Sequence, residues 1–128
     1  MGRVLIVEDN ELNLKLFHDL LTIQEHEVVI SRDGLNLVEL IKNTRPDLIL
    51  MDIHLNGLSG IDLIQTLKAN QDTKYIPIIT ITAFALKVDQ IKISKSGCDM
   101  YLSKPVSIDK FFKAIEKFIP SAIKKNKL

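Results

Sequence analysis

The sequence has few of the features that mark secreted, membrane or nucleic-acid-binding proteins. It has one cysteine, Cys98, so no internal disulfide can form, which agrees with a reducing compartment. No signal peptide precedes the first apolar run, and no run approaches the roughly 20 residues of a membrane span. Seventeen basic side chains against sixteen acidic ones give a net charge of +1, which favours neither nucleic acid nor anionic membranes. We expect a cytoplasmic protein without nucleic-acid binding or membrane insertion.

The composition is that of an ordinary globular domain. The chain has 128 residues, of which 46% are hydrophobic and 26% charged, enough to bury a core. No linker and no internal sequence repeat divides it. We therefore expect one domain over residues 1–120, followed by a short basic tail, 121–128, that is frayed.

The apolar run at the centre of the chain is the best candidate for a buried strand. Residues 46–60 read PDLILMDIHLNGLSG, apolar from Leu48 to Ile53 except at Asp52. A short apolar run bounded by turn residues is typical of a strand buried on both faces. A carboxylate at the end of such a strand is costly unless it is used, and open parallel sheets bind ligands beyond these ends. Asp52 is therefore the first candidate functional residue.

The rest of the chain alternates short apolar runs with amphipathic stretches. This pattern predicts strands at 3–7, 27–31, 46–53, 75–82 and 99–103, and helices at 11–24, 37–44, 59–69, 83–96 and 107–118. Strands that alternate with helices favour a parallel sheet, and right-handed crossovers favour helices on both faces. We expect an α/β fold, a doubly wound (βα)5 sandwich with strand order 2-1-3-4-5.

The acids at the predicted strand ends suggest a metal site. If strands one and three are neighbours, Glu8, Asp9 and Asp52 meet at one edge of the sheet. Three crowded carboxylates repel one another unless they bind a proton or a hard divalent cation. Carboxylate oxygens, a backbone carbonyl and waters suit Mg²⁺.

Two further strand ends bring a hydroxyl and a cation to the same edge. Thr82 closes the fourth strand, and Lys104 follows the fifth. A hydroxyl, a lysine and a metal together would neutralise the charge on a transferring phosphoryl group. The sequence therefore predicts a site that places a phosphoryl group on Asp52.

The order of these residues resembles the receiver domain of two-component response regulators. The motif consists of Glu8-Asp9, Asp52, Thr82-Ala83 and Lys104-Pro105, and the resemblance covers about residues 3 to 119. It implies the flavodoxin-like, CheY-like fold. The runs VLIVEDNELNLKLFHDLL, PDLILMDI, ITAFALK and SKPVS are most similar to single-domain regulators of cell division.

The resemblance implies a role for each matching position. Asp52 is the phosphoacceptor and attacks a phosphohistidine on a partner. The implied ligands of Mg²⁺, for which Mn²⁺ can substitute, are Asp9, Asp52 and the backbone carbonyl of His54, with Glu8 acting through water. Lys104 pairs with the phosphoryl group.

Switching and docking are also implied. Thr82 moves to bond the phosphoryl group and Tyr101 follows it, which reshapes the face of the fourth helix, fifth strand and fifth helix. The Lys104–Pro105 bond is expected to be cis. Four residues are candidates for partner docking: Asn10, Leu12, Leu14 and Pro105.

The sequence departs from the family pattern in the loop after Asp52. Asn56 stands where a proline is common, so we expect a looser loop with intact chemistry. His54 and Phe84 flank the path of an attacking water. Their bulk predicts slow hydrolysis, with a phosphoryl lifetime of minutes or longer.

Each role has a simpler alternative. Asp52 could be a loop or capping acid, Asp9 could cap the first helix, and Lys104 could be a surface charge. Thr82 and Tyr101 could be ordinary strand residues. Leu12 and Leu14 could be partly buried, while the three histidines are read as surface, Cys98 as core and the tail lysines as solvated: His18, His26, His54, Lys124, Lys125 and Lys127.

Several functions share this architecture. The leading hypothesis is a response regulator, not an enzyme beyond its own phosphorylation and slow autodephosphorylation. It would signal through protein binding, with a sensor histidine kinase/phosphatase as partner and as a monomer or a weak phosphorylation-dependent dimer. The alternative is an intermediate that passes phosphate to a histidine phosphotransfer protein.

Two other classes fit less well. A flavodoxin-like carrier needs a Ser/Thr/Gly-rich loop where this chain has Glu8-Asp9-Asn10, which would repel a flavin phosphate. A phosphohydrolase with an aspartyl nucleophile usually has a second acid where this chain has His54.

Overall fold

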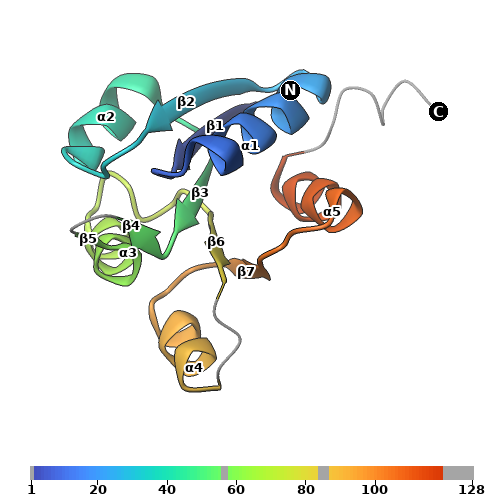
Figure 1. Cartoon of the computed structure of the whole chain (residues 1–128). Helices are drawn as coiled ribbons and strands as arrows, with labels where there is room; N and C mark the ends of the chain where they lie inside the picture. The colour runs from blue at the N-terminus through green and yellow to red at the C-terminus, as the bar shows by residue number, and fades with distance from the viewer. Residues whose placement is uncertain (1, 56–57, 84–86, 120–128) are drawn as a thin grey trace.

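The computed structural model describes residues 2–55, 58–83 and 87–119, which form an α/β sandwich around one parallel sheet. The strands of the sheet, in spatial order, are β2 (Glu27–Ser31), β1 (Arg3–Val7), β3 (Leu48–Asp52), β6 (Ile78–Thr82) and β7 (Met100–Ser103) (Figure 1). The predicted order 2-1-3-4-5 is confirmed, because β6 and β7 are the fourth and fifth strands of this sheet.

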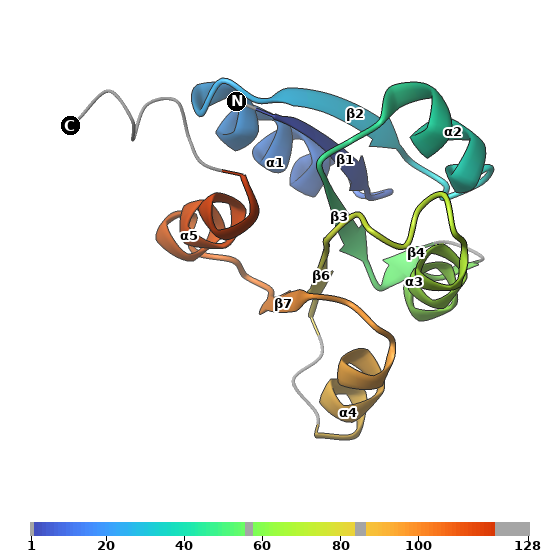
Figure 2. The same ribbon diagram turned by 180° about the vertical axis from the view of Figure 1, so that it is seen from behind.

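Helices cover both faces of the sheet. The pair α1 (Glu11–Ile23) and α5 (Ile108–Phe118) lies on one face, and α2 (Leu37–Thr44), α3 (Gly60–Ala69) and α4 (Lys87–Lys95) lie on the other (Figures 1 and 2). Successive residues of a strand point to opposite faces. Val4 and Leu50 therefore pack under α1 and α5, whereas Leu5 and Met51 pack under α2 and α3.

The three central strands are buried on both faces, as their continuous apolar runs predict. Every residue of β3 and of β6 is buried. On the face of α1 and α5, the rings of Phe17 and Phe111 stack with centroids 5.4 Å apart and an interplanar angle of 3°.

Several element boundaries differ from the predicted ones. The fourth strand begins at Ile78 rather than Tyr75, because Pro77 has no N–H for the ladder and Tyr75 is 79% exposed. The described part of the fourth helix begins at Lys87. Ile53 leaves the sheet and is followed by a short antiparallel hairpin, β4 (His54–Leu55) and β5 (Leu58–Ser59), which the sequence did not predict.

Side-chain orientations in α1 also differ from the prediction. Leu14, a docking candidate in the sequence, is buried at 3%, whereas Leu16 and Ile23 are 41% and 59% exposed. His26, expected at the surface, is buried at 5%. Cys98 is partly buried against the core, as expected. The predicted frayed tail lies outside the described residues.

Candidate functional site

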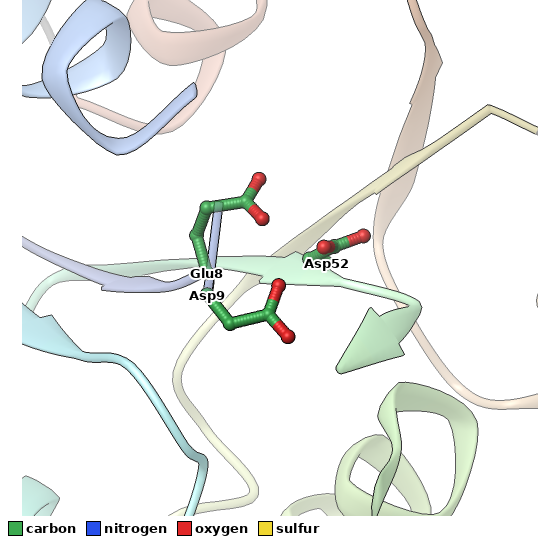
Figure 3. Close-up of side chains that lie close together, drawn as sticks. All are labelled: Glu8, Asp9 and Asp52. Carbon is green, nitrogen blue, oxygen red and sulfur yellow. The ribbon is translucent and has the colours of Figure 1, made fainter. Parts of the chain in front are cut away.

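Three carboxylates converge at the carboxyl edge of the sheet. Glu8 and Asp9 follow β1, and Asp52 ends β3; Figure 3 shows their side chains directed toward one shared space. One carboxylate oxygen from each lies within 4.8 Å of the others. Glu8 and Asp52 are almost fully buried, at 1% and 4% exposure, and Asp9 is half-buried. The predicted juxtaposition of the acids is therefore present.

Strand pairing sets the level of the acids. In the parallel register Val7 lies opposite Met51, so the residues that follow each strand emerge side by side. The Glu8 amide donates to Ser31 O at 3.1 Å, which fixes the chain just beyond β1. Asp52 is still paired with Ile81 of β6. The acids thus sit at the paired ends of the central strands.

Hydrogen bonds from backbone amides two positions further along the chain orient two of the carboxylates. The Asn10 amide donates to Glu8 Oε2 at 3.2 Å, and the His54 amide donates to Asp52 Oδ1 at 3.2 Å. Asn10 also caps α1, since its side chain accepts a bond from the Asn13 amide at 3.0 Å. The cap of the first helix is therefore Asn10.

Gly60 lets α3 approach the acceptor strand, and the sequence analysis did not single it out. Its amide donates to Ile53 O at 2.9 Å. A Cβ at position 60 would lie 2.7 Å from Ile53 Cα and would collide with Asp52 O. Only glycine fits there. In the sequence, the sign of this close approach was a glycine at the start of the helix that follows the strand of Asp52.

Lys104, which follows the edge strand β7, brings a cation to the acids. Its Nζ lies 3.5 Å from Glu8 Oε1 and 3.6 Å from Asp52 Oδ1. The Lys104 amide donates to Thr82 O at 2.7 Å, which ties the loop after β7 to the end of β6. The peptide bond between Lys104 and Pro105 is cis, as the resemblance implies. One ammonium group thus faces two buried carboxylates.

The three carboxylates of the cluster carry more negative charge than the one ammonium group of Lys104 can neutralise. Burial, followed by the hydrogen bond and the negative charge of Asp52, raises the pKa of Glu8 from 4.5 to about 7, against the opposing charge of Lys104. Near neutral pH a proton therefore competes for a place among the acids. A divalent cation would relieve the same repulsion without that proton.

The donor set fits a hard cation. All three side chains offer oxygen, and the loop of His54 lies directly beyond Asp52. Oxygen-only sites that leave room for water are typical of Mg²⁺ and Mn²⁺ rather than of zinc or copper. Among the described residues, no other group of three or more acids, histidines or cysteines comes together in this way.

The predicted switch residues lie on neighbouring strands. Thr82 is fully buried at the end of β6, and Tyr101 is 38% exposed on β7. The register places Thr82 opposite Ser103 and Thr80 opposite Tyr101. Met100 and Leu102 pack under α5, so Tyr101 points to the opposite face, that of α4. Phe84 and Asn56 lie outside the described residues.

The predicted docking residues separate into two groups. Leu12 is 81% exposed and lies one turn from the acids, whereas Leu14 belongs to the core under α1. Leu14 is therefore not available for docking, which corrects that expectation. Pro105 lines a cavity of about 420 Å³ between β7 and the start of α5. Two further exposed side chains, Leu16 and Ile23, extend the apolar stripe of Leu12 along α1; the sequence analysis did not single them out.

Comparison with known proteins identifies the family. Residues 4–116 match the response regulator receiver domain, so the chain belongs to this family of two-component signalling proteins.

Curated relatives that match nearly the whole chain include response regulators of one kind. The polar-differentiation response regulator DivK of Brucella anthropi is 44% identical over 119 residues, which cover 93% of this chain and 97% of the relative. DivK of Brucella ovis is also 44% identical with the same coverage.

Solved structures agree with this assignment. The receiver domain of the sensor histidine kinase PA1611 from Pseudomonas aeruginosa, with magnesium coordinated in its active-site cleft, has a TM-score of 0.84 and 30% identity, over 94% of this chain and 98% of that chain. The Mn²⁺-bound response regulator Rcp1 has a TM-score of 0.78 and 29% identity, over 92% of this chain and 94% of that chain. Among the described residues of this chain, no helix has the length and apolar character that crossing a membrane requires.

Proposed function

We propose that Asp52 accepts a phosphoryl group from a phosphohistidine on a partner histidine kinase, and that the phosphorylated domain signals by binding other proteins. The observation that carries this proposal is the position of Lys104 Nζ, 3.6 Å from Asp52 Oδ1 and 3.5 Å from Glu8 Oε1, beside a cluster of buried acids. A lone surface lysine would have no such partners.

The residues of the chain divide the work of phosphoryl transfer. A carboxylate oxygen of Asp52 attacks phosphorus, the bond from phosphorus to the donor nitrogen breaks, and the histidine keeps that electron pair. The His54 amide holds Asp52 Oδ1 at 3.2 Å and so orients the nucleophile. Lys104 stabilises the charge that develops on the phosphoryl oxygens.

A metal ion is part of the proposal. Asp9, Asp52 and the backbone carbonyl of His54 would hold Mg²⁺ or Mn²⁺, and Glu8 would act through a bound water. When bound, the ion neutralises charge on the phosphoryl oxygens. Burial, followed by the hydrogen bond and negative charge of Asp52, raises the pKa of Glu8 to about 7. This supports the assignment, because a cation among the acids would offset the same repulsion.

The output is proposed to pass through Thr82 and Tyr101. Thr82 would bond the new phosphoryl group, and the exposed ring of Tyr101 would turn inward on the same face of the sheet. This would reshape the surface formed by α4, β7 and α5. The similarity to DivK supports a role in cell division or cell polarity.

The kinase is proposed to dock on α1. The exposed side chains of Leu12, Leu16 and Ile23 recur at helical spacing and form one apolar stripe that begins next to the acids. An apolar stripe on one helix suits an amphipathic helix of a partner. Docking there would bring a phosphohistidine close to Asp52.

The chemistry is tested by incubation with acetyl phosphate, with and without Mg²⁺, followed by intact-mass measurement. The wild type should gain one phosphoryl group only with Mg²⁺, and Asp52→Asn should gain none. Asp62→Asn, an exposed acid on α3, is the matched control and should behave as the wild type. Equal labelling of Asp52→Asn would rule the proposal out.

A further inference from the structure

The buried side chain of His26 has no part in the proposed signalling chemistry. It lies just before β2, at the opposite end of the sheet from the acids, and is 5% exposed. Its Nδ1 accepts a hydrogen bond from the Gly2 amide at 3.1 Å. This bond fixes the tautomer, because an Nδ1 that accepts must carry no proton.

The second ring nitrogen makes the arrangement unusual. Nε2 then carries the proton, yet it is buried and has no hydrogen-bond partner among the residues that the structure describes. A second proton would turn Nδ1 into a donor facing the donor N–H of Gly2. The imidazolium would therefore have two buried N–H groups without acceptors, which the closed structure cannot accommodate.

The bond between Gly2 and His26 lies where the two ends of the described chain, Gly2 and Ile119, meet. Gly2 O accepts from the Glu27 amide at 2.9 Å. The Asp47 amide donates to Arg3 O at 2.7 Å, and the Arg3 amide donates to the Asp47 side chain, Oδ2, at 2.8 Å. Gly2 also packs against Ile119, since a Cβ at position 2 would lie 2.8 Å from Ile119 Cγ2. Ile119 is itself buried at the end of α5.

We propose that His26 is a proton-operated clasp: as neutral imidazole it holds the start of β1 against the end of α5, and protonation releases both. Opening is local because the groups that it frees lie at the margins of the sheet. The ladder between β3 and β6 does not involve the bond between Gly2 and His26. The C-terminal end of α5 would thereby gain freedom in acid.

The charges around the clasp act in both directions. Burial lowers the pKa of His26 below its usual 6.5, the positive charge of the amino terminus acts the same way, and Asp47 opposes them. Arg3 is paired with Glu27 at 2.9 Å, and Glu25 is exposed on the turn before His26. In the last turn of α5 the charged groups are Glu116 and Lys117.

The test is amide hydrogen exchange followed by NMR between pH 7.5 and pH 5, corrected for the intrinsic exchange rate. The amides of Glu27 and Ile119, bonded to Gly2 O and Ile115 O, are the reporters, and the Ile49 amide in β3 is the reference. We expect the two reporters to lose protection below about pH 6.5, with the midpoint at which the His26 ring titrates, while Ile49 stays protected.

Two variants separate the clasp from general acid sensitivity. In His26→Asn, an amide oxygen can replace Nδ1 as an acceptor that does not titrate, so the reporters should stay protected in acid. His18→Asn, on the surface of α1, should behave as the wild type. The proposal is overturned if His26 titrates while the reporters stay protected, if His26→Asn keeps the pH dependence, or if Ile49 opens together with them.

Discussion

At the scale of single residues, the site depends on two sources of positive charge for the buried carboxylates: the ammonium group of Lys104 and a proton on Glu8. Lys104 lowers the pKa of Glu8, but burial and Asp52 raise it more, so the net shift is upward to about 7. The group is therefore about half protonated at neutral pH in the metal-free folded protein, whereas it is ionised at that pH in the unfolded chain. A substitution of Glu8 should therefore change the free energy of unfolding and the rate of phosphorylation separately.

The first prediction concerns stability and pH. Since the folded pKa of Glu8 is raised, its contribution is fully present below pH 4.5 and is lost as pH rises through about 7. In EDTA, Glu8→Gln should match the wild type at pH 4.5 and exceed its free energy of unfolding by up to about 3 kcal/mol at pH 8. Urea unfolding at both pH values measures this, and a pH-independent difference would contradict it.

The second prediction concerns the cation. Lys104→Met should slow phosphorylation by acetyl phosphate about a hundredfold, because it removes a preorganised positive charge from the transferring group. The rate of phosphoryl incorporation by intact mass measures the effect. Lys110→Met, at the exposed start of α5, should leave the rate unchanged. Equal rates for Lys104→Met and the wild type would mean that Lys104 does not contact the phosphoryl group.

At the scale of secondary-structure elements, the junction of β3 with α3 positions the acceptor. Gly60→Ala would place a methyl group 2.7 Å from Ile53 Cα, so helix and strand must move apart. We expect a loss of about 1–3 kcal/mol in stability, measured by urea unfolding, and slower phosphorylation. Ser59→Ala is the control, because the Ser59 side chain makes no cap bond to α3. A Gly60→Ala variant of wild-type stability would refute this close approach.

The two leucines at the start of α1 give the next prediction. Leu14→Ala should destabilise the domain by about 2–5 kcal/mol, because Leu14 is 3% exposed in the core. Leu12→Ala, at 81% exposure, should leave stability unchanged but slow phosphoryl transfer from the cognate kinase more than from acetyl phosphate. Unfolding curves and the two transfer rates are the measurements. Equal slowing with both donors would place the effect in the site rather than in docking.

The elements also show what the sequence could predict. The strands were readable because a strand buried on both faces is apolar throughout, as in residues 48–51. The inward face of α1 was not, because apolar side chains surround much of that helix and only the packing in the core shared with the sheet and α5 selects Leu14 over Leu16. The hairpin β4–β5 has two residues in each strand, too few for a period.

At the scale of the whole molecule, the site exists only when the complete sheet has formed. Glu8 and Lys104 are 96 positions apart in sequence and come within 3.5 Å through the order β1-β3-β6-β7. The sequence predicted which acids meet, since parallel strands end at one edge. It could not predict that His26 is buried, because that depends on how the chain at Gly2, before β1, meets it in the folded protein.

The central claim is that the acidic cluster directs a phosphoryl group to Asp52 rather than to a neighbouring acid or histidine. The most direct measurement is peptide-level mass spectrometry of the Mg²⁺- and acetyl-phosphate-treated protein, after borohydride reduction to mark acyl phosphates. We predict one reduced position, residue 52. A mark at Glu8 or Asp9, or phosphate retained on His54, would contradict the account.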